Sequence, residues 1–160
     1  MFLGLTTFTW IHTILSLVAL AAGIVVVRQL LSSRVSRGWT ALFVVTAFAT
    51  SATGFAFPFE RFIDSHWTGL AALVVLALVI LAHYVFSLAG FWRWVYSLGM
   101  VLSLYFLALV TIAQAFKKVP ALTAMAPTQS EPPFLVAQLV ALAIFGVLAI
   151  AAVRKFRPVA

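Results

Sequence analysis

The chain has 160 residues, of which 65% are hydrophobic and only 8% are charged, whereas an average soluble domain carries about 25% charged residues. Ten Lys or Arg residues and three acids give a formal charge of +7, but these cations are scattered at the ends of apolar runs, which argues against nucleic-acid binding. The absence of cysteine excludes disulfides, thiolate metal sites and iron–sulfur clusters.

Five apolar segments are each long enough to cross a lipid bilayer as a helix, which requires about 20 mostly apolar residues. In chain order they cover residues 5–27, 39–57, 66–89, 92–116 and 134–153. They predict an all-α integral membrane bundle, one transmembrane domain over residues 1–160, with the bilayer as its main partner. The first segment lacks a positively charged leading region, so we expect it to stay as an anchor.

The distribution of Lys and Arg predicts an N-out, C-in orientation. With the loop after the first helix in the cytoplasm, seven cations lie inside, and three cations and all three acids lie outside. The inside set is Arg28, Arg34, Arg37, Arg93, Arg154, Lys155 and Arg157. An excess of Lys and Arg in cytoplasmic loops is the usual signature of orientation.

The first predicted helix carries a polar stripe with spacings of three and four residues, formed by Thr9, His12, Thr13 and Ser16. Gly23 extends the same face as an expected point of close helix packing. His12 lies about 10 Å below the outer boundary at 1.5 Å per residue. An ionisable side chain at that depth is a functional candidate, and a neutral imidazole held by Thr9 or Ser16 is the alternative.

Other predicted helices add polar groups at a similar depth, and together they predict a polar pocket that opens to the extracytoplasmic side. Its expected residues are His12, Thr50, Thr53, His66, Gln114, Glu131 and Gln138. Two structural alternatives stay open. Hydroxyl side chains often donate to the carbonyl one turn back, and Gln114 and Gln138 are able to bond one another across two helices.

His12 and His66 are also the candidates for a cofactor, since haem b requires one or two axial nitrogens in a helical bundle. The paired-histidine spacing on one helix that marks many haem b bundles is absent. The sequence shows no metal-binding pattern, no GxSxG motif, no P-loop and no GxGxxG motif. We therefore expect no metal-ion site, and the absence of these motifs weighs against an enzyme without deciding the question.

The stretch KVPALTAMAPTQSEPPF joins the outer ends of the last two predicted helices and holds four of the six prolines. Each proline fixes a backbone angle, and seventeen residues exceed what an antiparallel connection needs. We expect residues 117–133 to form an ordered lid over the outer pocket, with Glu131 within reach of His12 or His66. A stiff surface linker is the alternative.

With TWIH, ATSATGFAFPF, SHWTG and PTQSEPPF taken together, the chain resembles a group of small, uncharacterised bacterial inner-membrane proteins. The resemblance covers nearly the whole chain. It implies a multi-pass protein of the bacterial cytoplasmic membrane, and it implies no activity.

The resulting hypothesis is a non-enzymatic membrane protein that binds a small or lipid-like ligand in the outer pocket, or serves as an accessory subunit of a membrane complex. Its partner is then another membrane protein or a second copy of the chain. One alternative is a redox protein that carries haem b on His12 or His66. A second alternative is a small channel or proton path that runs from His12 to His83.

Overall fold

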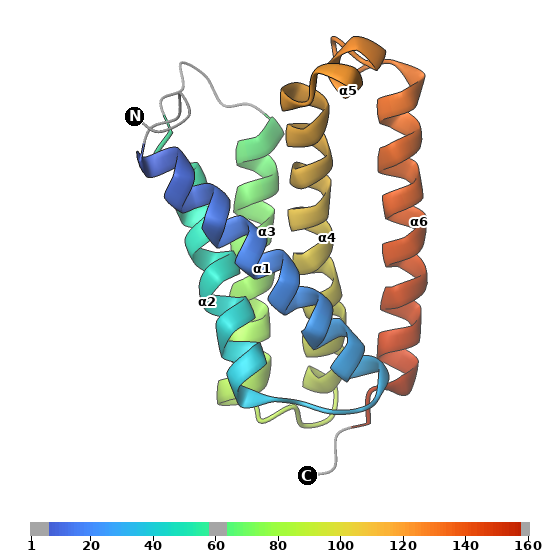
Figure 1. Cartoon of the computed structure of the whole chain (residues 1–160). Helices are drawn as coiled ribbons and strands as arrows, with labels where there is room; N and C mark the ends of the chain where they lie inside the picture. The colour runs from blue at the N-terminus through green and yellow to red at the C-terminus, as the bar shows by residue number, and fades with distance from the viewer. Residues whose placement is uncertain (1–6, 58–63, 158–160) are drawn as a thin grey trace.

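The computed structural model describes residues 7–57 and 64–157, which are helical apart from short connections and include no strand. Long helices lie side by side in one bundle, and a short helix, α5, crosses the end of α4 and α6 (Figure 1). The elements are α1 (Thr7–Leu31), α2 (Arg37–Gly54), α3 (Asp64–Ile80), the π-helical turn η1 (Leu81–Val85), α4 (Trp92–Lys118), α5 (Pro120–Met125) and α6 (Pro132–Lys155).

Four segments of the described chain are long and apolar enough to cross a membrane: Thr7–Leu31, His66–Val85, Trp92–Lys118 and Pro132–Lys155. The predicted all-α membrane bundle is confirmed at this level. The second predicted span corresponds to α2, which has 18 residues. Arg37 and five hydroxyl residues lower the hydropathy of this helix, although it packs against both α1 and α3.

The helices α1 to α4 form most of the core, and α6 packs mainly against α4 and to a lesser extent against α1. Gly23 lies at a tight contact of α1 with α2 and α4. A Cβ atom there would lie 2.6 Å from Leu104 Cδ1 and 2.8 Å from Phe43 Cε2. The predicted close-packing point at Gly23 is therefore confirmed. From this contact α1 runs obliquely across its neighbours, so that its outer end lies well away from α6 (Figure 1).

The third predicted helix does not continue to Ala89. Its α-helical part ends at Ile80, the π-helical turn ends at Val85, and Ser87 and Leu88 then have positive φ angles of 48° and 61°. Phe86 stacks on Trp92 with ring centroids 4.0 Å apart, which holds the turn against the start of α4. The connection to α4 is thus longer and more structured than predicted.

Residues 117–133 are not a simple loop. Lys117 and Lys118 complete α4, and α5 begins at Pro120, a position where proline costs no backbone hydrogen bond. Thr123 Oγ1 donates to the carbonyl of Phe116 at 2.8 Å, which ties α5 to the end of α4. The apolar ALTAM stretch is therefore helical.

Candidate functional site

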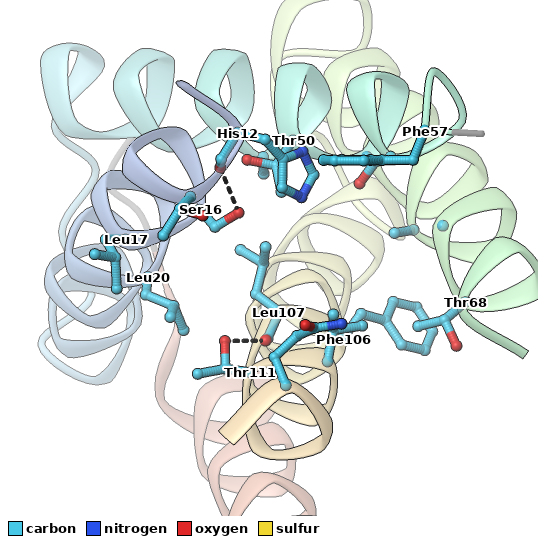
Figure 2. Close-up of a pocket in the computed structure, with 18 of the residues that line it drawn as sticks. His12, Ser16, Leu17, Leu20, Thr50, Phe57, Thr68, Phe106, Leu107 and Thr111 are labelled. Carbon is cyan, nitrogen blue, oxygen red and sulfur yellow. Dashed lines mark hydrogen bonds between the residues drawn. The ribbon is translucent and has the colours of Figure 1, made fainter. Parts of the chain in front are cut away.

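A cavity of about 470 Å³ lies between the helices α1, α2, α3 and α4 (Figure 2). Four of the seven predicted pocket residues line it: His12, Thr50, His66 and Gln114. Thr53 does not line it but holds one of these residues in place. The polar stripe predicted on the first helix also faces this cavity, through Thr9, His12, Thr13 and Ser16.

The polarity of the cavity wall changes along the length of the bundle. Near the ends of α1 and α4 it is bordered by His12, Gln114 and the two lysines Lys117 and Lys118. Farther along, the walls are mainly apolar and include Leu20, Ala72, Leu76 and Leu107. Ser103 lies fifteen residues before Lys118, or about 22 Å along α4 at 1.5 Å per residue. The cavity therefore has a polar end beside Lys117 and Lys118, called its outer end below, and an apolar end, called its inner end.

His12 is oriented by a short chain of hydrogen bonds. Its Nδ1 lies 2.9 Å from Thr53 Oγ1, and that hydroxyl donates to the carbonyl of Ala49 at 2.7 Å. Because a hydroxyl has a single proton, Thr53 Oγ1 accepts from His12, which assigns the imidazole proton to Nδ1. Nε2 is then an acceptor on a ring that also meets Phe57 edge-on, with centroids 5.1 Å apart. Figure 2 shows this ring between the helices.

Most hydroxyl groups around the cavity donate to their own helix. Thr13 bonds to the carbonyl of Thr9, Ser16 to that of His12, and Thr111 to that of Leu107, each within 2.8 Å. For these side chains the structural alternative of back-bonding is confirmed, so the polar stripe by itself does not indicate a ligand.

Thr50 and Ser103 differ from these hydroxyls. Their side chains are 8% and 2% exposed, and neither oxygen has a hydrogen-bond partner among the described residues. A buried hydroxyl without a partner costs about 1–3 kcal/mol. Both residues border the cavity, so a ligand there is in a position to supply the missing partner.

His66 is 5% exposed and reaches the cavity from the start of α3. Its ring lies beside Phe55, with centroids 5.5 Å apart. His12 and His66 therefore border one cavity, although they belong to different helices.

The other two predicted pocket residues, Glu131 and Gln138, do not line the cavity. Gln138 Nε2 donates to the carbonyl of Leu109 at 3.3 Å, and its Oε1 is buried without a partner among the described residues. It meets a backbone carbonyl of α4 rather than Gln114, so the predicted pair of glutamines is wrong. The reason is position, because α6 packs on the side of α4 away from the cavity.

The predicted lid over the pocket is also wrong. No residue from Val119 to Phe134 lines the cavity. Gln129 Nε2 donates to the carbonyl of Ala113 at 2.7 Å, and α5 packs against α4. These contacts hold the segment over the end of α4 and α6, as Figure 1 shows.

The Glu131 side chain forms hydrogen bonds within its own turn. Its carboxylate accepts hydrogen bonds from the N–H and Oγ1 of Thr128 at 3.1 Å and 2.9 Å, and from the N–H of Ser130 at 3.0 Å. Desolvation acts to raise the pKa of Glu131, but the hydrogen bonds from Thr128 and Ser130 together outweigh it and lower the pKa below its ordinary value. These bonds satisfy backbone donors just before α6.

We expect this turn to loosen in acid. A lowered carboxyl pKa means that the turn is stabilised at neutral pH, and this stabilisation fades once the pH falls below about 4.3 and is lost below the lowered pKa. The protection of the Thr128 and Ser130 amides against hydrogen exchange, taken relative to the intrinsic exchange rate at each pH, should therefore decrease in that range. In Glu131→Gln this protection should be lower at pH 7 and should not decrease further in acid. An unchanged pH profile in this variant would contradict the role of Glu131.

Ser103, Lys117 and Lys118 line the cavity but were not predicted as pocket residues. A signal for Ser103 was present, since Ser103, Leu107 and Gln114 are spaced by four and seven residues and so share one helix face. The two lysines lay within the predicted lid, residues 117–133, but were not predicted as pocket residues, although both border the cavity.

His83 lies outside the cavity, toward the far end of α3. Its ring stacks on Tyr96 with centroids 5.3 Å apart, and the Tyr96 hydroxyl lies 3.1 Å from Thr40 Oγ1. Between this cluster and the cavity is a layer of apolar side chains, each 0% exposed: Phe43, Val79 and Met100. Among the described residues, nothing forms a polar path from His12 to His83.

Within residues 7–57 and 64–157 there is no group of three or more His, Cys, Asp or Glu side chains that could hold a metal ion. The site is thus defined by one oriented histidine, one buried histidine, two hydroxyls that have no partner in the described part of the chain, and two lysines. Comparisons of the chain with models of protein families, with curated proteins and with solved structures find no match.

Proposed function

We propose that the chain crosses the bacterial cytoplasmic membrane five times, with its N-terminus outside and its C-terminus inside. The length of α2 supports a fifth span, because 18 residues extend about 27 Å at 1.5 Å per residue, close to the thickness of a bilayer core. The cations Arg34, Arg37 and Arg93 lie at helix starts and turns at one end of the bundle, together with Arg154 and Lys155 at the end of α6. An excess of Lys and Arg at one end of a membrane bundle favours a cytoplasmic location of that end.

We propose that the protein is a non-enzymatic receptor or carrier. It binds a small, lipid-like molecule in the cavity that lies between α1, α2, α3 and α4. The observation that carries this proposal is the pair of buried hydroxyls, Thr50 and Ser103, which border the cavity and have no partner among the described residues. A cavity of about 470 Å³ with apolar walls and a few polar groups is typical of a ligand site.

Native mass spectrometry of the purified protein tests this proposal with a matched pair of variants. At Gly54 an added Cβ would lie 4.0 Å from His12 Cε1, so Gly54→Leu extends into the cavity, while Gly146→Leu points into open space. We expect wild type and Gly146→Leu to carry or take up a small amphiphile, and Gly54→Leu to lose at least about tenfold in affinity. Equal binding by all three proteins, or binding by none, would overturn the proposal.

A second candidate function is haem b binding, which the geometry of His12 favours. A histidine that binds a metal usually donates its other ring N–H to a neighbour, and Nδ1 of His12 does so to Thr53. His66 borders the same cavity. We expect protein expressed with ample haem to show a Soret band that disappears in His12→Ala and persists in His83→Ala. A colourless wild-type protein would eliminate this candidate.

A further inference from the structure

The charge at the outer end of the cavity points to a more specific ligand, provided that the cavity binds a ligand as proposed above. Among the described residues that line the cavity, the formally charged ones are Lys117 and Lys118, and both are exposed. Glu131 does not offset them there, because its carboxylate is bound to Thr128 and Ser130 outside the cavity. The outer end therefore favours a negatively charged group.

The polar end of the cavity offers hydrogen-bond donors for such a group. Thr50 has a hydroxyl without a partner among the described residues, and a lysine has three donors and no acceptor. A ligand that complements this wall is rich in acceptors, as carboxylates and phosphates are. A cationic ligand would meet two like charges at the outer end.

The inner end of the cavity requires an apolar group. Leu20, Leu76 and Leu107 border it, and the space extends along much of the outer half of α4. Leu17 also lines the cavity although it is 58% exposed, so the wall between α1 and α4 is open at this level. Figure 2 shows Leu17 and Leu20 on α1, across from Thr111 on α4. In a bilayer this gap would face lipid, which suits a ligand that arrives from the membrane.

We infer that the ligand is a single-chain anionic amphiphile, whose carboxylate or phosphate group lies at Lys117 and Lys118 and whose alkyl chain fills the apolar inner end. The amphiphile enters sideways between α1 and α4. The shared chemistry is an anionic head on one apolar chain, from a fatty acid or from a lipid phosphate.

A series of twelve-carbon probes tests this inference on the full-length protein in a non-ionic detergent. The probes are dodecanoate, dodecyl phosphate, dodecanol and dodecylamine, with acetate and inorganic phosphate as heads without chains. We expect both anionic amphiphiles to bind about tenfold or more tightly than dodecanol, and dodecylamine, acetate and inorganic phosphate to bind weakest. Native mass spectrometry measures the stoichiometry, and titration calorimetry measures Kd.

Three double variants isolate the role of charge. Lys117→Gln with Lys118→Gln should reduce dodecanoate binding to the level of dodecanol and leave dodecanol binding intact, which also shows that the cavity is folded. Lys117→Arg with Lys118→Arg should retain the preference. Arg34→Gln with Lys155→Gln removes the same net charge from residues outside the cavity and should also retain it.

The outcomes separate this inference from the proposed function. If dodecanol or dodecylamine binds as tightly as dodecanoate, the anionic head is wrong and the lipid-like pocket stands. If acetate or inorganic phosphate binds as tightly as the amphiphiles, the requirement for an alkyl chain is wrong. If no probe binds, both the inference and the proposed function are wrong.

Discussion

Replacing Gly23 with leucine should prevent the bundle from assembling. A Cβ at this position would lie 2.6 Å from Leu104 Cδ1 and 2.8 Å from Phe43 Cε2, and both neighbours are buried core residues. Gly23→Ala alone should lower the free energy of unfolding by roughly 1–3 kcal/mol, because two packed side chains must move. The three further carbons of leucine have no space between α1, α2 and α4. We therefore expect Gly23→Leu to aggregate during purification.

Gly146→Ala is the matched control for this prediction. It is also a glycine within a long helix, and an added Cβ there meets nothing within 4 Å. Alanine favours the helix over glycine by about 0.5–1 kcal/mol, so this variant should be unchanged or slightly more stable. Unfolding in a denaturing detergent, followed by circular dichroism, measures both variants. Equal stability of Gly23→Ala and Gly146→Ala would show that close packing at Gly23 is unimportant.

The polar face of α1 could be read from the sequence because helical periodicity alone determines it. Thr9, His12, Thr13 and Ser16 recur every three or four residues, and a chain that is helical there must present them together. The same reasoning applies to Gly23, whose small size on that face indicated a close contact. His12 and Thr50 meet at one cavity because their helices are antiparallel neighbours and their depths agree.

The placement of Glu131 and Gln138 could not be read in the same way. Depth in the membrane says how far along a helix a residue lies, and it does not say which neighbour that helix packs against. Since α6 packs on the side of α4 that faces away from the cavity, Gln138 donates to the carbonyl of Leu109 and does not reach the cavity. Glu131 has backbone donors within three residues, and these nearby partners prevail over any distant one.

The end of α3 and the start of α5 could not be predicted from the sequence either, and each has a physical reason. No glycine or proline lies between Leu70 and Ala89, so the apolar pattern gives no sign of the π-helical turn at Leu81–Val85 or of the positive φ angles that follow. Pro120 was a visible start signal for α5, but the proline indicated only a stiff backbone, either in a lid or in a surface linker. A proline supports either a helix start or a stiff loop, and the Thr123 bond to Phe116 decides between them.

Blocking the gap between α1 and α4 should slow both the uptake and the release of a bound amphiphile. The chain has no cysteine, so Leu17→Cys provides a single thiol for a bulky maleimide. Leu17 borders the cavity and is 58% exposed. Ile14 lies one turn away with 55% exposure and does not line the cavity, so Ile14→Cys is the matched control.

We expect the labelled Leu17→Cys protein to take up dodecanoate at least about tenfold more slowly than the labelled Ile14→Cys protein, within the range over which association rates vary among variants of one site. The order of addition separates a blocked gap from a filled cavity. Ligand loaded before labelling should be retained longer if the gap is the route, whereas a label that merely occupies the cavity would expel it. Equal rates in the two labelled proteins would mean that the ligand enters from the water side past Lys117 and Lys118.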